Sequence, residues 1–491
     1  MPESMKLFTV WFVLLASCTT LTAWSDNYLR IQPDSCQKIP AEQPLNQVLP
    51  CYLLQPDAHY QWEIISQSDV ASENVTLYTI QLNSLKWSIG EQAGVDHPIW
   101  KHRVDVYVPK SIKHNTSLLY INGGTLYPEP KPSEPNSKEI NFQKIALETH
   151  SVVINLRDIP NQFLTFKHSK PLKEDDLIAY TWKRFLDDPE NNRQWPLRLP
   201  MVKSTIRAMD MVQELLTQKK VTVDNFVVSG GSKRGWTAWL TAAMDKRVTA
   251  VVPAVIDILN LRPSMHHHHK AYGRWAPAVN SYYELMPTLD SPQMDKLLAI
   301  VDPYSYRNQL SLPKFLINAS ADDFFLPDSS QFYWDDLLGK KWMRVLPNLR
   351  HYIVRMEPEL VTDTLESFYG AFIEERPLPS LSWETREDSL IVHSSMPPKS
   401  ARLWKAFNPS ARDFRATADN PDVEKFQSEP IKFDCKENCR FELDLKDQGK
   451  GWRAYFIDTS YSNEPYADIT ISTRVFIHPA TYPVKDKPLD E

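Results

Sequence analysis

A serine at a sharp turn between a strand and a helix is the first feature of this sequence that could carry chemistry. The apolar run at residues 226–228 stops at two glycines, Ser232 follows them, and a helical pattern begins at Lys233. This order is typical of a nucleophile elbow, in which small neighbours let a strained turn hold the serine hydroxyl away from the backbone. The N–H of Lys233 at the helix start would face an oxyanion formed there. A glycine-rich turn without chemistry is the alternative.

The elbow departs from the usual G-x-S-x-G spacing. Arg234 stands where the second glycine belongs, and a glycine follows one residue later at Gly235. A second glycine pair, Gly123 and Gly124, follows the apolar run at residues 117–121 after Asn122. Glycines just past a buried strand are typical of the loop that supplies a second oxyanion N–H, so we expect Gly124 to contribute one. A plain turn is the alternative for this pair.

Two later loops carry the residues that would activate the serine. The apolar run at residues 312–317 leads to Asp322 and Asp323, and either is a candidate for the acid of a catalytic triad. His351 follows the last short strand pattern, where the general base is expected. The order serine, aspartate, histidine is that of α/β-hydrolases and differs from that of chymotrypsin-like or subtilisin-like enzymes. We therefore expect Ser232 to attack an ester or amide, with proton transfer through His351 and without a metal or cofactor.

The elements that must position these residues alternate between strands and helices, within a domain that we place at residues 59–376. Such alternation predicts a mainly parallel sheet with helices on both faces, as in an α/β-hydrolase fold. The expected strands cover residues 75–82, 102–108, 117–121, 151–156, 221–228, 248–256, 312–317 and 344–346. The expected helices beside the elbow helix cover residues 140–149, 174–186, 199–218 and 360–373.

An aromatic-rich segment at residues 257–300 interrupts this pattern, and we expect it to be an irregular, cap-like insertion that roofs the pocket. It contains four consecutive histidines, His266–His269. A metal site is one interpretation, but consecutive side chains rarely converge on one ion without further ligands. We therefore expect a solvated or pocket-edge loop at this position.

From Pro377 the pattern changes to short alternating strands with no helical pattern between them. This predicts a β-sandwich over residues 377–491. The expected strands cover residues 390–393, 402–404, 431–433, 440–445, 452–457 and 467–477.

The start of the chain predicts export. The apolar run at residues 7–16 is too short for an ordinary membrane-spanning helix and fits the core of a secretory signal. Residues 15–18 resemble a bacterial lipobox, in which Cys18 is lipidated and anchors the protein to a membrane; signal cleavage after Ala23 is the alternative. We expect an envelope or secreted protein in which residues 1–18 are the signal segment and residues 19–58 form a surface arm.

Cysteine usage agrees with export. Apart from Cys18, the cysteines form two local pairs, Cys36 with Cys51 and Cys435 with Cys439. Two short-range disulfides in an oxidising compartment explain this spacing, and a zinc half-site is the alternative for the second pair. The net charge of −6 argues against a nucleic-acid partner.

Several segments together resemble the PhoPQ-activated pathogenicity-related protein family. They include INGGT at 121–125, GGSKRGWTAWLTAAMDKRV at 230–248, NASADDFFLPDSSQFYWDDL at 318–337, LPNLRH at 346–351 and GWRAYF at 451–456. The resemblance implies an exported α/β-hydrolase-like protein with an immunoglobulin-like C-terminal domain. The family pattern resembles G-D-E-F-F at residues 321–325, which favours Asp322 over Asp323, although Ala321 departs from its glycine.

The elbow, with a basic residue after the serine and a displaced glycine, resembles that of glucuronoyl esterases, so Arg234 is compatible with catalysis. We expect a serine hydrolase acting on a small molecule, a carbohydrate ester or a peptide. An ester is favoured, because the sequence shows no recognisable acidic pair to hold the N-terminus of a peptide. The alternative is a non-catalytic envelope, signalling or virulence-associated binding protein on a hydrolase scaffold.

Overall fold

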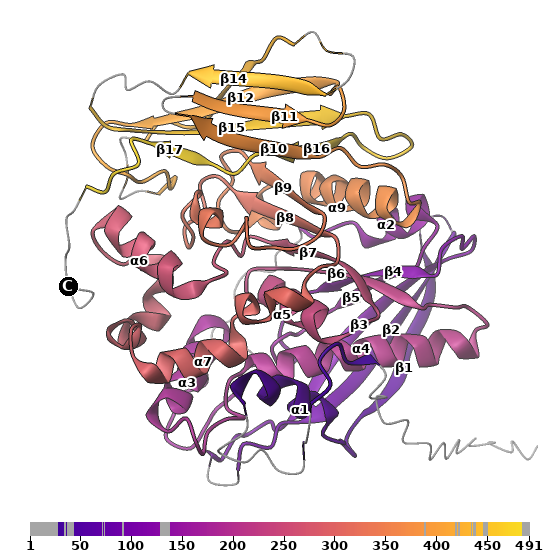
Figure 1. Cartoon of the computed structure of the whole chain (residues 1–491). Helices are drawn as coiled ribbons and strands as arrows, with labels where there is room; N and C mark the ends of the chain where they lie inside the picture. The colour runs from indigo at the N-terminus through magenta and orange to yellow at the C-terminus, as the bar shows by residue number, and fades with distance from the viewer. Residues whose placement is uncertain are drawn as a thin grey trace, which may run out of the picture.

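The structure is a computed structural model (Figure 1). It describes residues 28–33, 36, 44–70, 72, 74–90, 93–127, 138–386, 389–417, 420, 423–433, 435, 438–444 and 450–483. The expected signal segment with Cys18, and the alternative cleavage position after Ala23, lie outside these residues. Within the described part of the chain, no helix combines the length and the apolar character needed to cross a membrane.

A nine-stranded mixed sheet forms the centre of the molecule, in the order β1-β2-β3-β5-β4-β6-β7-β8-β9 (Figure 1). The neighbours from β1 to β5 pair antiparallel, and those from β5 through β4 to β9 pair parallel. This strand order and the helices on both faces define an α/β-hydrolase fold, so the predicted fold class is confirmed. The strands are β1 (Gln61–Val70), β2 (Val75–Lys86), β3 (Ile99–Pro109), β4 (Thr116–Ile121), β5 (Val153–Leu156), β6 (Asn225–Gly231), β7 (Val248–Ala254), β8 (Lys314–Ala319) and β9 (Lys341–Leu346).

Strand alternation divides the apolar residues of the sheet between two cores. On β6, Val227 packs in the core that contains Ile145 and Phe368, whereas Val228 packs in the core that contains Met201 and Trp239. The first core faces α2 (Phe142–Thr149) and α9 (Pro358–Ile373), and the second faces α4 (Arg198–Gln218) and α5 (Lys233–Met244). Because both faces are covered, the parallel strands carry the continuous apolar runs that identified them in the sequence. The remaining helices of this region are η2 (Leu45–Gln47), α1 (Val48–Leu54), α3 (Glu174–Asp187), η5 (Pro303–Gln309), η6 (Ser329–Phe332) and α8 (Ile353–Met356).

The insertion between β7 and β8 is helical, so the expectation of an irregular segment at residues 257–300 is wrong. It contains α6 (Leu261–Tyr272), the 3-10 helix η4 (Pro277–Thr288) and α7 (Pro292–Val301). Asn260 and Gly273 lie at the two ends of α6, and the backbone of each has the left-handed conformation. Ser291 caps α7, because its side chain accepts a hydrogen bond from the Met294 N–H. These capping residues are ordinary helix boundaries, but the histidines and aromatic residues between them obscured the helical pattern.

The four histidines lie on α6, and the expectation of a solvated or pocket-edge loop is also wrong. His267, His268 and His269 are each 2% exposed. The rings of the four histidines have different neighbours. For example, His266 Nε2 lies 2.8 Å from Asp290, and His268 Nε2 accepts a hydrogen bond from the Ala276 N–H. Among the described residues, no group of three or more histidine, cysteine or acidic side chains is arranged to hold a metal ion.

The C-terminal part forms two antiparallel sheets that lie above the α9 side of the large sheet (Figure 1). Apolar residues of both sheets, including Val392, Phe441 and Ile457, share one core, so they form a sandwich. The expected strand at residues 431–433 is wrong, since β13 ends at Pro430, and the expected strand at 467–477 is divided in two. The strands are β10 (Leu381–Arg386), β11 (Ser389–Ser394), β12 (Ser400–Asn408), β13 (Gln427–Pro430), β14 (Cys439–Asp444), β15 (Trp452–Tyr461), β16 (Ile469–Ser472) and β17 (Phe476–His478).

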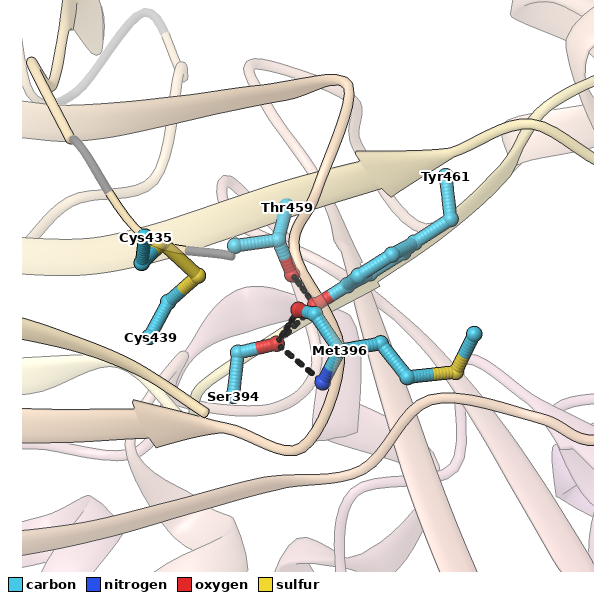
Figure 2. Close-up of a disulfide and its surroundings, with 6 residues drawn as sticks. All are labelled: Ser394, Met396, Cys435, Cys439, Thr459 and Tyr461. Carbon is cyan, nitrogen blue, oxygen red and sulfur yellow. Dashed lines mark hydrogen bonds between the residues drawn. A yellow bond between two sulfur atoms is a disulfide. The ribbon is translucent and has the colours of Figure 1, made fainter. Parts of the chain in front are cut away.

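Both predicted disulfides are present. The Cys435–Cys439 bond closes the entry to β14, beside a hydrogen-bonded cluster in which Ser394 and Tyr461 join facing sheets (Figure 2). The Cys36–Cys51 bond ties the N-terminal arm to α1, with Cα atoms 5.2 Å apart. The apolar side chains of α1 are buried, because the helix packs against α4, and the described part of the arm therefore lies deeper than a surface arm.

Candidate active site

Ser232 occupies a strained turn between β6 and α5. Its backbone has φ 55° and ψ −126°, a conformation that L-residues rarely adopt. The Ser232 N–H donates to the Ala254 carbonyl on β7 at 2.8 Å, which fixes the turn to the neighbouring strand. A Cβ at Gly235 would lie 2.7 Å from the Gly230 carbonyl oxygen, so the displaced glycine lets α5 approach β6 closely.

Arg234 is accommodated because Gly230 faces it. A Cβ added to Gly230 would lie 3.0 Å from the Arg234 Cβ and 2.9 Å from its carbonyl oxygen, so one side chain fits between strand and helix, but not two. The Arg234 guanidinium donates to both Glu174 oxygens, at 2.8 and 2.6 Å. The substitution of the usual glycine therefore leaves the strained turn intact.

The loops after β8 and β9 bring Asp322 and His351 together. The His351 Nδ1 atom lies 3.0 and 2.9 Å from the two Asp322 oxygens. Asp322 also accepts from the N–H of Phe324 at 2.8 Å, and the Phe324 ring lies over His351 with centroids 4.2 Å apart. Asp322 is 4% exposed and His351 5%. The carboxylate is thus placed to orient the imidazole and to stabilise its protonated form.

Asp323 has a different partner. Its carboxylate accepts from the Nε of Arg350 at 2.8 and 3.1 Å. The geometry therefore associates Asp322 with His351, and the alternative Asp323 with an ion pair beside it.

The C-terminal sandwich supports the loop that carries His351. Asn348 has φ 61°, a conformation that asparagine tolerates, and its N–H donates to the Ser320 hydroxyl at 2.8 Å. The Asn348 side chain donates to the Phe426 carbonyl at 3.0 Å and accepts from the Phe426 N–H at 2.7 Å. Phe426 precedes β13, so the second domain fixes the position of a loop in the first.

Ser232 and His351 line the same cavity. This cavity, called here the polar cleft, is lined by residues from eight parts of the chain: 120–125, 138–140, 162, 173–175, 231–234, 254–255, 324 and 351–355. Within the described part of the chain, the Ser232 hydroxyl forms no hydrogen bond, and the ring of His351 bonds only to Asp322. Catalytic hydrogen bonds are often long before substrate binds, so the common cavity is the informative observation.

The expected oxyanion donors also face the polar cleft. Lys233 is the first residue of α5, so its N–H precedes the first intrahelical bond. Gly124 has φ 131°, and a Cβ there would clash with Asp158, so only glycine fits. The Gly123 N–H is bonded to the Asn122 side chain at 2.8 Å, whereas among the described residues nothing accepts from the Gly124 N–H.

Glu174 is an important residue that the sequence did not reveal. It lies at the start of α3 and bonds to Arg234 and, through its second oxygen, to the Lys233 ammonium at 2.9 Å. Burial tends to raise the pKa of Glu174, but Arg234 and Lys233 outweigh this effect and hold the pKa well below its usual range. Gln162 connects Glu174 to the carbonyl of Gly124, with donor distances of 2.8 Å to each. This network joins the elbow to the second oxyanion loop.

Glu174 and Asp175 form an acidic pair beside Ser232, which the sequence did not identify. Both carboxylates are already neutralised, because Lys233 bonds to Asp175 at 3.0 Å as well as to Glu174. The Tyr282 hydroxyl donates to Asp175 at 2.9 Å. The pair therefore holds the cations of the elbow and is not free to receive the ammonium group of a peptide.

A second serine–histidine contact lies in the core, between β2 and β3. The Ser84 hydroxyl lies 2.9 Å from His102 Nε2, and both residues are 0% exposed. Burial lowers the pKa of His102 to about 4, against a smaller raising effect of Asp158. Ser204 completes this internal cluster at 2.8 Å from Ser84. With no access to solvent, these residues satisfy each other's polar groups within the core.

The strand order places the protein in the α/β-hydrolase class, and Ser232 stands at the strand end where this class carries its nucleophile. The family model of the PhoPQ-activated pathogenicity-related proteins matches residues 49–415. The chain is 33% identical over 456 residues to autocrine proliferation repressor protein A of Dictyostelium discoideum, covering 88% of this chain and 90% of that protein. The chain therefore belongs to the PhoPQ-activated pathogenicity-related protein family.

Similar solved structures include two carbohydrate esterases. Acetyl xylan esterase 1 from Thermoanaerobacterium sp. JW/SL YS485 is 14% identical, with a TM-score of 0.42, and the match covers 68% of this chain and 96% of that chain. A glucuronoyl esterase from Solibacter usitatus is 13% identical, with a TM-score of 0.36, over 65% of this chain and 90% of that chain.

Proposed function

We propose that this chain is an exported serine hydrolase that cleaves esters. Ser232 is the nucleophile, His351 the general base and Asp322 the residue that orients it. The observation that carries the proposal is the double contact of Asp322 with His351 Nδ1, at 3.0 and 2.9 Å, in loops that face a serine on a strained turn. Such a contact fixes the tautomer in which Nε2 is free to accept a proton.

The mechanism follows from these positions. His351 takes the proton of Ser232 as the Oγ atom bonds to the carbonyl carbon, and the N–H groups of Lys233 and Gly124 bind the oxyanion. The ester C–O bond then breaks, and His351 delivers the proton to the departing alcohol. Water attacks the acyl-enzyme in the second half of the reaction, with His351 again as the base.

An ester is favoured over a peptide by the neutralised acidic pair. Glu174 and Asp175 lie beside Ser232 but are held by Lys233, Arg234 and Tyr282. Releasing Glu174 for a peptide ammonium would leave Arg234 without a carboxylate partner, and releasing Asp175 would remove one of the two carboxylates that hold Lys233. Carbohydrate esters and other small-molecule esters remain within the proposal, and amide cleavage is its less favoured form.

Export is part of the proposal and is supported by the two disulfides, which persist in oxidising compartments. We place the protein in the bacterial envelope or outside the cell, with lipidation at Cys18 as the proposed anchor.

A second candidate function is a signalling or binding role without catalysis. It is favoured by the 33% identical relative, whose name describes a repressor of proliferation. In that case the polar cleft would bind a ligand, and loss of the Ser232 hydroxyl would leave function intact.

Hydrolysis of 4-nitrophenyl acetate by four matched variants tests the proposal. Ser232→Ala and Asp322→Asn should lower kcat/KM by about 10²–10⁴, because they remove the nucleophile and the tautomer control. Ser84→Ala and Asp323→Asn are controls of the same type at residues outside the proposed triad, and they should stay within about threefold of wild type. Equal losses in Asp322→Asn and Asp323→Asn, or full activity in Ser232→Ala, would contradict the assignment.

A further inference from the structure

Two cavities of opposite character meet at Ser232. One is the polar cleft, whose lining includes the charged residues Lys138, Glu139, Lys173 and Arg355. The other, called here the apolar pocket, is lined mainly by aliphatic and aromatic side chains. Its walls come from the helical insertion, the elbow helix, α3 and the loop after β8, and they include Trp182, Trp236, Ile258, Val279, Leu285 and Phe325.

The boundary between the two cavities runs through the reacting atoms. Both cavities are lined by Asp175, Ser232, Lys233 and Phe324. His351 lines the polar cleft, and it is not among the described residues that line the apolar pocket. The general base therefore reaches a bound ester from the side of the polar cleft.

This asymmetry fixes the direction in which an ester must bind. In a serine hydrolase the histidine protonates the departing alcohol, so the alcohol must lie on the histidine side of the carbonyl carbon. The acyl group, which stays on the Ser232 oxygen until water removes it, must extend the other way. In this protein, the side of Ser232 away from His351 opens into the apolar pocket.

We propose that the apolar pocket is the acyl-binding site and that the substrates are esters of an apolar acid with a polar, solvent-facing alcohol. The proposal rests on the proposed function and adds the substrate class. Ser232 Oγ bonds to the carbonyl carbon of the apolar acid, the ester C–O bond breaks, and the alcohol leaves into the polar cleft with the proton from His351. Water then releases the apolar acid.

The helical insertion provides most of the selectivity. Val279 and Leu285 of η4 and Met265 of α6 are almost completely buried, yet they line the pocket. An acyl chain placed against them loses contact with water, which is worth about fourfold in binding for each methylene group. An alcohol chain in the polar cleft gains little binding free energy, because charged side chains surround it.

Two series of esters separate the acyl side from the alcohol side in the wild-type protein. The first series is 4-nitrophenyl acetate, butyrate and hexanoate, and the second is ethyl, butyl and hexyl acetate, followed by acid release. We expect kcat/KM to rise about fifteenfold for each two methylenes of acyl chain and to change by less than about threefold along the alcohol series. A rise along the alcohol series instead, or no rise along either, would overturn the proposal while leaving the proposed function intact.

A variant of the apolar pocket tests where the acyl chain of the ester binds. Val279→Phe should lower the ratio of kcat/KM for hexanoate to that for acetate by about tenfold, because the larger ring occupies the space of the chain. Thermal unfolding of the same sample shows whether the variant is folded. A folded Val279→Phe protein with the wild-type ratio would place the acyl chain elsewhere. If wild-type protein cleaves none of these esters and no fluorophosphonate labels Ser232, the proposed function itself fails, and the inference with it.

Discussion

Replacing Glu174 with glutamine tests how the unusual elbow is held. The substitution preserves the shape of the side chain and removes the charge that lies between Arg234 and Lys233. Three close contacts lose their charge, at 2.6 and 2.8 Å to Arg234 and 2.9 Å to Lys233. The two cations are largely buried, with side chains 12% and 8% exposed, and only Lys233 keeps a second carboxylate partner.

The size of the effect lies between two limits. Removing one partner of a fully buried ion pair costs about 3–5 kcal/mol, and breaking a surface pair costs about 0–1 kcal/mol. Because the Glu174 side chain is 32% exposed, solvent screens part of its interaction, and we expect Glu174→Gln to lower the free energy of unfolding by about 2 kcal/mol. We also expect slower labelling of Ser232 by a fluorophosphonate, on the order of tenfold, because Lys233 and Arg234 follow the nucleophile directly.

Urea unfolding at neutral and acidic pH measures this prediction. The pKa of Glu174 is held well below its usual range, so its stabilisation is present above its pKa in the unfolded chain and is lost as the pH falls through its folded pKa. The difference between wild type and Glu174→Gln should therefore shrink in acid. Asp187→Asn is the matched control, because it breaks an exposed pair with Lys183 at 3.5 Å on the same helix. Equal stability and equal labelling of wild type and Glu174→Gln would refute the reasoning.

Three further predictions concern other parts of the chain. Burial raises the pKa of Asp257 to about 8, although the hydrogen bond from Tyr333 lowers it. Because the folded protein holds this proton more tightly than the unfolded chain does, the wild-type free energy of unfolding should fall by up to about 1.4 kcal/mol per pH unit from about pH 4 to pH 8. Asp257→Asn should flatten this slope in thermal unfolding. Asn348→Ala should reduce kcat/KM on 4-nitrophenyl acetate by about tenfold with the fold retained, since the contacts to Phe426 hold the His351 loop, and an unchanged kcat/KM would argue against this support. Cys18→Ser should release the protein from membranes into the soluble fraction, and unchanged membrane association would contradict lipidation.

The sequence predicted the parallel strands well because these strands are buried on both faces, whereas the largely exposed β1 was not among the expected strands. The runs at residues 117–121 and 312–317 lie within one or two residues of β4 and β8. The elbow was equally clear, since two glycines and a serine at a strand end have few other uses. These features depend on local composition, which a single sequence displays directly.

The structure of the insertion and the pairing of Glu174 and Asp175 depend on partners that are distant in the sequence. His267 is buried because its ring lies between Asp328 and Tyr482, 61 and 215 residues away in the chain. Glu174 meets Arg234 across 60 residues. No local sequence pattern predicts such pairings. The sequence alone therefore predicts a loop for the histidine run and does not reveal the acidic pair.

The choice between Asp322 and Asp323 was likewise a matter of loop geometry. Adjacent residues point in different directions, and only the folded loop shows that the first contacts His351 and the second Arg350. The resemblance to the family favoured the same residue, but the sequence alone left both open.

Ester cleavage by this protein requires Ser232 to be an activated nucleophile. The most direct measurement is intact and peptide mass spectrometry of the protein after treatment with a fluorophosphonate, beside Ser232→Ala and His351→Ala. We expect one adduct per chain, located on Ser232 and lost in both variants. An unlabelled, well-folded wild-type protein, or an adduct that survives Ser232→Ala, would contradict this expectation and would favour a ligand-binding role for the polar cleft.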